Sequence, residues 1–247
     1  MSPDRKQRIE PRSDPRLDAC RERLAPPAGG GRARRVPLAA GLAGAAGAAM
    51  GVVVLLLASD RAAQAADADA GEVAYAPCAV CHGDEGRGRA DGTFPRIAGQ
   101  HATVVVKQIE DIRSGRRGNP IMASHVAMLT DPEEMADIAA YVERLSPGPR
   151  EAPARAEGAE RGALLYRRDC ARCHGAHGEG SAEGAVPVVA GQHSAYLLRQ
   201  LRAIAGSRRK NAHPGMVEVV FDYPDEDLRA VVAHLSQLPW PGPAAER

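Results

Sequence analysis

The sequence predicts an all-α fold built from two tandem repeats, and three observations lead to this prediction. Apolar residues recur at helical spacing, no segment reads convincingly as a strand, and short motifs recur 92 residues apart. Aromatic residues make up only 3% of the 247 residues, whereas Gly (26) and Pro (19) are plentiful. Because few large rings leave each repeat a thin core, we expect each repeat to be completed by something that it binds.

Each repeat is expected to hold the same helices in the same order. A first helix (69–80 and 157–172) runs into a cysteine motif, and a Gly-rich loop follows it. The next helix (101–112 and 193–205) starts at a histidine, His101 or His193, which we expect at the surface. The last helix begins at Asp131-Pro132 in the first repeat, since Pro is favoured in a first turn. The apolar stripes of the second and last helices are Val105, Ile109 and Ile112; Leu197, Leu201 and Ile204; Met135, Ile138, Val142 and Leu145; and Leu228, Val231, Leu235 and Leu238.

The first 65 residues are predicted to be a leader. Residues 1–35 are rich in Arg, Asp and Pro, and an uncharged run over 36–58 follows them. This run has the length and flanks of a signal peptide or of a membrane anchor. Ala63-Gln64-Ala65 fits a signal-peptidase site, so cleavage after Ala65 is one expectation and an uncleaved anchor is the other. Either way, the rest of the chain is expected in the periplasm, because the Arg cluster before the run keeps the N-terminal side in the cytoplasm.

The body of the chain divides into a domain over 66–145, a Pro-rich linker over 146–156 and a domain over 157–240. Residues 66–247 carry a net charge of −4, which argues against nucleic-acid binding. Charge is uneven along this body, since residues 66–149 carry −5 and residues 150–247 carry +1. We therefore expect the two domains to prefer differently charged partners.

Two copies of one motif carry the chemistry. Cys78-Ala79-Val80-Cys81-His82 and Cys170-Ala171-Arg172-Cys173-His174 are both C-x-x-C-H, the attachment signature of c-type haem. Two thiols one helical turn apart can add to the two vinyl groups of a haem, and the adjacent His then lies under the iron. The sequence therefore predicts two covalently bound haem c groups, with His82 and His174 as iron ligands.

Other uses of the cysteines are less consistent with the pattern. A zinc site would need the two pairs to meet, and two disulfides would each close a very small loop. A thioredoxin-like pair needs a βαβ context that the sequence lacks. None of these alternatives uses the histidine that follows both pairs.

A methionine is the expected sixth ligand of each iron, since His plus Met closes a haem and suits it to electron transfer. Met122 is the first choice in repeat one, with Met128 as the runner-up, and Met216 is the candidate in repeat two. Met122 and Met216 both lie eight residues before the turn that precedes the last helix. His125 and His213 are weaker alternatives, because they occupy unrelated positions in the two repeats.

Two prolines are candidates for orienting the ligating histidines. Pro95 and Pro187 each follow the motif His by 13 residues. We expect carbonyls of these segments to accept the Nδ1 proton of His82 and His174, which would fix each ring. The basic runs at 113–117 and 207–210 occupy equivalent places and are candidates for neutralising haem propionates.

At these positions the chain resembles the dihaem cytochromes c of the cytochrome c4 type. The resemblance covers about residues 68–240, with CAVCHG, CARCHG, FPRIAGQH, VPVVAGQHSAYLLRQL, NPIMASHVAML and DPEEMADIAAYV as matching stretches. It implies two tandem cytochrome c domains related by a pseudo-two-fold axis, with haem propionates at the domain interface. It further implies thioether links at Cys78, Cys81, Cys170 and Cys173, and iron ligands His82, Met122, His174 and Met216. Repeat one departs from the pattern at Val104, where repeat two has Tyr196.

The function expected from these features is single-electron transfer and not catalysis. The partners would be redox proteins, with a donor complex or dehydrogenase on one side and a terminal oxidase or similar acceptor on the other. One alternative is an electron-accepting subunit of a periplasmic dehydrogenase. Another is a dihaem enzyme of the thiosulfate dehydrogenase or peroxidase type, which needs an open or unusual ligand at one haem.

Overall fold

The protein was analysed as a computed structural model that describes residues 65–148 and 157–240. The expected leader, with its apolar run and Cys20, and most of the linker lie outside the described residues. Both described segments are helical, and their only β-type pairing is an isolated bridge between Ser181 and Val186. None of the described helices is long and apolar enough to cross a membrane.

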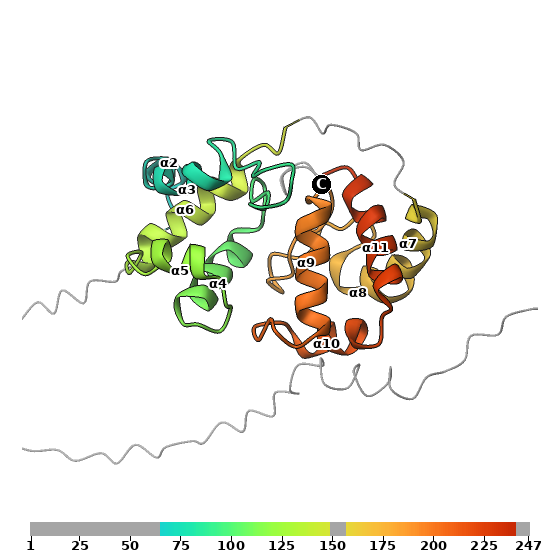
Figure 1. Cartoon of the computed structure of the whole chain (residues 1–247). Coiled ribbons are helices and arrows are strands. Elements are labelled where there is room, and N and C mark those ends of the chain that lie inside the picture. The colour runs from blue at the N-terminus through green and yellow to red at the C-terminus, as the bar shows by residue number, and fades with distance from the viewer. Residues whose placement is uncertain (1–64, 149–156, 241–247) are drawn as a thin grey trace, which may run out of the picture. The chain divides into compact units, whose positions relative to one another are not determined.

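The two segments repeat one helical arrangement, which confirms the predicted fold class (Figure 1). The first domain consists of α2 (Ala68–Ala74), α3 (Ala76–His82), α4 (Ala102–Arg113), α5 (Pro120–Val126) and α6 (Pro132–Arg144). The second consists of α7 (Ala159–Leu165), the π-helix η1 (Tyr166–Cys170), α8 (Ala171–His174), α9 (Ser194–Ala205), α10 (Pro214–Phe221) and α11 (Asp225–Gln237).

Short polar side chains start several of these helices. Asp67, Asn119 and Asp131 occupy N-cap positions, and the side chain of each accepts a hydrogen bond from a backbone N–H of the first turn. A proline in the first turn supports α3, α5, α6 and α10. Helix starts are thus specified locally, by sequence signals that require no tertiary contact.

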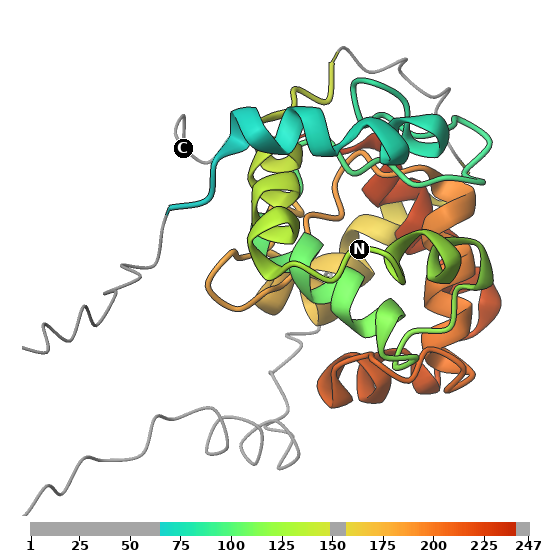
Figure 2. The same ribbon diagram turned by 90° about the vertical axis from the view of Figure 1, so that its left-hand side faces the viewer.

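The first and last helices of each domain cross in close contact at a glycine. A Cβ atom on Gly71 would lie 2.0 Å from the carbonyl oxygen of Asp137 in α6. A Cβ atom on Gly162 would lie 1.8 Å from that of Ala230 in α11. Figure 2 shows α2 crossing α6 in this way. Only glycine permits such an approach of two helix backbones, so the two glycines set how the motif helices meet the core.

A one-residue insertion distinguishes the two domains. Gly71 and Tyr75 precede Gly162 and Tyr166 by 91 residues, whereas the cysteine motifs lie 92 residues apart. The second domain absorbs the extra residue in η1, where the chain widens into a π-helix between Tyr166 and Cys170. Each cysteine motif therefore has the same position in its domain, although the second motif lies one residue further from its glycine and tyrosine than the first.

Glutamine side chains join the domains reciprocally. Gln100 pairs with the backbone of Val188, donating from Nε2 to its carbonyl oxygen (3.0 Å) and accepting its N–H at Oε1 (2.9 Å). Gln192 pairs with the backbone of Arg96 in the same way, at 2.7 and 3.0 Å. These four buried hydrogen bonds give the interface a two-fold pattern.

The expectation that His101 and His193 lie at the surface is wrong. Both are drawn into the interface, where the Nε2 atoms lie 2.9 Å from the carbonyl oxygen of Glu179 and 2.8 Å from that of Arg87. His101 is buried and His193 partly buried. Their places at helix starts indicated exposure, but each of these helix starts faces the Gly-rich loop of the other domain.

Arginines of the two equivalent runs meet in the same interface. Arg117 donates to Gln108 (2.8 Å), to Gln200 (3.3 Å) and to the hydroxyl of Tyr196 (2.8 Å). Arg209 donates to Gln200 and to Gln108, both at 3.0 Å. Burial and the nearby Arg117 lower the pKa of Arg209 to about 10. These two arginines are thus held mainly by neutral oxygen atoms.

Candidate functional site

The first motif lies on the short helix α3. Cys78 and Cys81 are free, partly buried thiols one helical turn apart. His82 ends the helix and is buried, with its Nδ1 atom 3.0 Å from the carbonyl oxygen of Pro95. An Nδ1–H that donates to this carbonyl leaves Nε2 free to coordinate a metal. Burial lowers the pKa of His82, which favours the neutral imidazole that a metal requires.

The second motif repeats this geometry on α8. His174 has its Nδ1 atom 3.1 Å from the carbonyl oxygen of Pro187, and burial lowers its pKa as well. Burial is also the main reason that the pKa of Cys170 rises to about 12. The carbonyl oxygens of Pro95 and Pro187 thus lie where the sequence analysis expected the partners of the two motif histidines.

A buried tyrosine supports each motif, and sequence reasoning missed both. The hydroxyl of Tyr75 donates to the carbonyl oxygen of Gly83 (2.9 Å), and that of Tyr166 donates to Gly175 (2.6 Å). Gly83 and Gly175 end the motif helices at φ angles of 78° and 79°. Each tyrosine thereby holds the residue directly after the motif His. The sequence did contain a signal for these two residues, because a tyrosine lies shortly before each motif although the chain has only five tyrosines.

The candidate sixth ligands occupy equivalent positions on two matching helices. Met122 is the third residue of α5, and Met216 is the third residue of α10. Both are partly buried, and each packs against the core of its own domain. Met128, the runner-up, is 86% exposed, which favours Met122.

The alternative histidine ligands are placed less favourably. His125 is exposed on α5. His213 is an exposed N-cap residue whose Nδ1 accepts the N–H of Gly215 at 3.1 Å. With Nδ1 used for capping and the ring at the surface, His213 lacks the burial of the methionine three residues later.

The residues present fit a covalent haem. Each domain offers two free thiols, an imidazole with Nε2 available and a partly buried thioether on a separate helix. The described residues supply no hydrogen-bond partner for the buried Arg87 Nε and Trp240 Nε1 atoms. Haem propionates are acceptors of the kind that such donors need. A zinc site is less consistent with the structure, because no three His, Cys, Asp or Glu side chains cluster for a metal within the described ranges.

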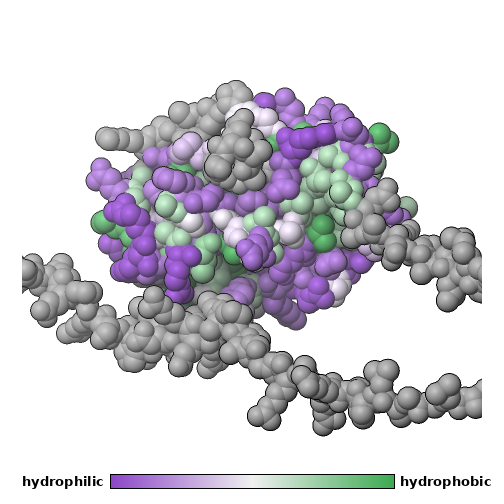
Figure 3. Space-filling view, turned by 180° about the vertical axis from the view of Figure 1, so that it is seen from behind, coloured by the Kyte–Doolittle hydropathy of each residue, from purple (hydrophilic) through white to green (hydrophobic). Residues whose placement is uncertain are grey.

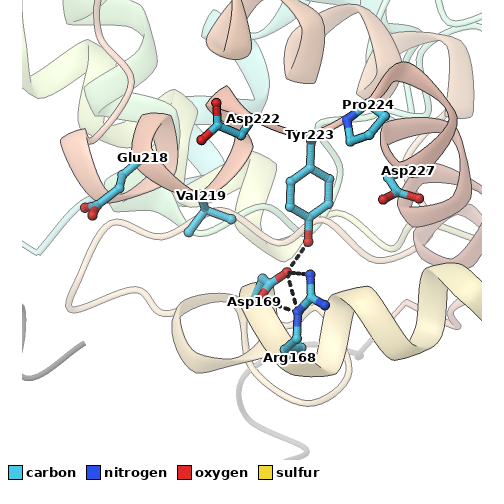
Figure 4. Close-up of a pocket in the computed structure, with 8 residues that line it drawn as sticks. All are labelled: Arg168, Asp169, Glu218, Val219, Asp222, Tyr223, Pro224 and Asp227. Atoms are coloured by element: carbon cyan, nitrogen blue, oxygen red, sulfur yellow. Dashed lines mark hydrogen bonds and ion pairs between the residues drawn. The ribbon is translucent and has the colours of Figure 1, made fainter. Parts of the chain in front are cut away.

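A polar pocket lies beside the second motif but does not include it (Figure 4). Its volume is about 390 Å³, and its lining includes Arg168, Asp169 and Tyr223. The Asp169 carboxylate accepts hydrogen bonds from Arg168 and from the Tyr223 hydroxyl. Since Asp169 directly precedes Cys170, these contacts anchor the start of the motif and leave the pocket outside the haem site.

Comparisons with known proteins agree with this geometry. The family model of cytochrome c matches residues 68–146 and 159–239. The thiosulfate dehydrogenase electron acceptor of Stutzerimonas stutzeri is 36% identical over 204 residues, covering 76% of this chain and 93% of that protein. Cytochrome c4 of Azotobacter vinelandii is 30% identical over 192 residues, covering 70% and 90%. The crystal structure of reduced cytochrome c4 from Pseudomonas stutzeri matches with a TM-score of 0.64 at 28% identity, covering 71% of this chain and 100% of that one.

Two family matches, one on each motif-bearing domain, account for the repeated thiol pairs and the repeated buried histidines. The chain belongs to the cytochrome c family and is a dihaem cytochrome of the cytochrome c4 type, whose two domains each carry one covalent haem c.

Proposed function

We propose that this dihaem cytochrome is a periplasmic carrier that moves single electrons between a redox donor and an acceptor such as a terminal oxidase. His82 and Met122 would ligate one iron, and His174 and Met216 the other. Cys78, Cys81, Cys170 and Cys173 would form the thioether links. The bound haem supplies the ferric–ferrous couple, while this chain's residues attach, orient and shield it.

One observation carries the proposal. Both domains combine a buried histidine, held through Nδ1 by a proline carbonyl, with a methionine at the third position of a matching helix. Such pairs close both irons, which suits outer-sphere electron transfer and leaves no open position for substrate. This symmetry supports a carrier over a dihaem enzyme.

Replacing each methionine tests the ligand assignment. We expect the purified holoprotein to contain two haems per chain, to show a full-strength methionine–ferric band and not to bind carbon monoxide. Met122→Leu and Met216→Leu should each lose about half of the band and open one haem to carbon monoxide.

Met128→Leu is the matched control, because it makes the same change at an exposed methionine of the same domain. A half-strength band in the unaltered protein would contradict the proposal, and so would loss of the band in Met128→Leu. The half-strength band would make the dihaem enzyme the better interpretation, whereas loss of the band in Met128→Leu would identify Met128 as the ligand in place of Met122.

A second function is favoured by one specific similarity. The relative that is 36% identical is named as the electron acceptor of thiosulfate dehydrogenase. This chain would accordingly accept electrons from such a dehydrogenase. Thiosulfate alone should leave both haems oxidised, whereas thiosulfate with a catalytic amount of the dehydrogenase should reduce both. Reduction by thiosulfate alone would instead identify an enzyme.

A further inference from the structure

The first domain exposes three large apolar side chains that the fold does not use. Val80 is 77% exposed, Ile121 58% and Met128 86%. Two other exposed apolar residues, Val73 (79%) and Leu164 (62%), occupy equivalent positions on the first helices of the two domains, so they do not distinguish the domains. Val80, Ile121 and Met128 are called the apolar rim below.

The rim residues adjoin the groups that hold one haem. Val80 lies between Cys78 and Cys81, and Ile121 directly precedes Met122. Met128 directly precedes Leu129, which packs against both the core cluster beside Cys78 and the cluster beside Met122. Because the thioether links and the proposed methionine ligand would hold the same haem, exposed side chains next to both would lie beside that haem.

The second domain keeps none of these apolar side chains at the equivalent positions, although Phe221, at the end of α10, is 64% exposed. The positions equivalent to Val80, Ile121 and Met128 are Arg172, Gly215 and Asp222. Arg172 and Asp222 are exposed. Two domains that repeat the same internal geometry therefore present different surfaces around their haems. Figure 3 shows that hydrophobic residues are interspersed among hydrophilic ones on one face of the molecule.

Acidic side chains accompany the apolar rim. Residues 65–148 contain 13 Asp and Glu against 8 Lys and Arg, whereas residues 157–240 contain 10 of each. Exposed carboxylates lie close along the chain to Val80 and to Met128. Burial is the main reason that the pKa values of Tyr75 and Cys78 are raised, and the smaller contributions of Asp84 to the first and of Glu134 to the second agree with carboxylates near α3. The exposed carboxylates that follow Val80 and Met128 are Asp84, Glu85, Asp131, Glu133 and Glu134.

We propose that the apolar rim of the first domain is a docking face for a basic redox protein, one that surrounds an apolar patch with Lys and Arg beside its own redox centre. This inference rests on the proposed carrier function and specifies which domain such a partner uses. Opposite charges steer the encounter, and a small apolar contact excludes water while still allowing rapid release. Electron-transfer complexes typically have small interfaces and short lifetimes, which fits a docking face made of a few apolar side chains.

Lysine substitutions on the rim test the proposal. The measurement is the second-order rate of electron exchange between the holoprotein and mitochondrial cytochrome c, used as a lysine-rich probe, at several ionic strengths. The rate of the unaltered protein should fall as salt rises. Val80→Lys and Met128→Lys should each slow exchange about tenfold at low salt, because a like charge then faces the probe.

Val73→Lys is the matched control, since it adds the same charge at an equally exposed apolar position away from the motif. It should change the rate less than twofold. Equal slowing by Val73→Lys and Met128→Lys would show that only net charge matters and would overturn the docking face. A rate that rises with salt would overturn the basic partner.

The carrier function has a separate readout. Haem content, the methionine–ferric band and electron exchange with hexaammineruthenium, a small cation that needs no docking face, should be preserved in all three variants. If the unaltered protein exchanges no electrons with this complex, the carrier function fails and not the docking face.

Discussion

The buried carboxylate of Asp111 has no counterpart in the other domain, where Ala203 occupies the equivalent position. Asp111 is 2% exposed and accepts hydrogen bonds from Lys107 (2.5 Å), from Arg116 (2.7 Å) and across the interface from Asn211 (2.8 Å). Burial alone raises its pKa, but the hydrogen bonds from these three residues outweigh burial and lower the pKa to about 2. The negative charge of Asp111 also acts on Arg209, where it partly offsets the lowering of the pKa by burial and Arg117.

We expect Asp111→Asn to remove a pH-dependent part of the stability. A carboxyl group whose pKa is lower in the folded protein stabilises the fold above its unfolded pKa of about 4. Its contribution, about 2 kcal/mol, is lost as the pH falls toward 2. Thermal unfolding of the holoprotein between pH 7 and pH 2 should show a smaller pH dependence in Asp111→Asn. Glu110→Gln, at an exposed neighbour, is the control, and an equal effect there would contradict the assignment.

Single functional residues were predictable where a motif specifies both the residue types and their spacing. C-x-x-C-H identified the thiols and the histidines, and the 13-residue spacing identified the prolines whose carbonyls face those histidines. Gly71 and Tyr75 were not identified, because their roles arise from contacts with a distant helix backbone and with a loop carbonyl. Neither contact leaves a local pattern in the sequence.

Helices α5 and α10 show how an element positions a candidate ligand. Each begins with an N-cap residue followed by proline, and the methionine is the third helical residue. In α5 the side chain of Asn119 accepts the backbone N–H of Met122 at 3.2 Å. This hydrogen bond ties the backbone of the candidate ligand to the start of its helix.

Removing that cap should loosen the first iron–methionine bond. Asn119→Ala is expected to lower stability by about 1 kcal/mol. The methionine–ferric band should then disappear in part at a lower temperature, because the cap holds only one of the two methionines. Ser124→Ala, which removes an exposed hydroxyl from the same helix, should leave the melting of the band unchanged. Simultaneous loss of the whole band in Asn119→Ala would contradict this assignment.

At the scale of elements, periodicity and caps predicted three helices in each domain, but they missed α5 and α10, and the first helix of each domain is divided. The segment expected over 69–80 forms α2 and α3, and that over 157–172 forms α7, η1 and α8. The residue inserted between Tyr166 and the second motif is accommodated within a helix. A π-helix depends on how the flanking turns are held, which apolar spacing does not report.

The molecule as a whole depends on its domain interface. Gln100 and Gln192 each bond the backbone of the other domain twice, and His101 and His193 each meet a carbonyl oxygen of the opposite loop. The interface thus contacts the segments that carry the Pro95 and Pro187 carbonyls. Domain contact and histidine orientation are thereby linked.

Replacing both glutamines should uncouple the domains. The double variant Gln100→Ala/Gln192→Ala loses four buried hydrogen bonds to the backbone of Arg96 and Val188. Each backbone group that is left unpaired costs about 1–3 kcal/mol of stability. We expect the calorimetric transition of the holoprotein to broaden or split in two. Arg199→Ala is the control, since it removes a single interdomain bond, to Gly92 at 2.6 Å. A sharp single transition in the double variant would show that these glutamines do not couple the domains.

The sequence by itself determined the fold class, the repeat, the attachment cysteines, the histidine of each motif and the methionine candidates, because each depends on residue type and spacing along one chain. Only the tertiary structure decided that Met128 is exposed, that His101 and His193 belong to an interface and that the glutamines pair across it. These outcomes depend on which surfaces of the two domains meet. Residues about 80 to 106 apart in the chain make those contacts, and no local periodicity encodes them.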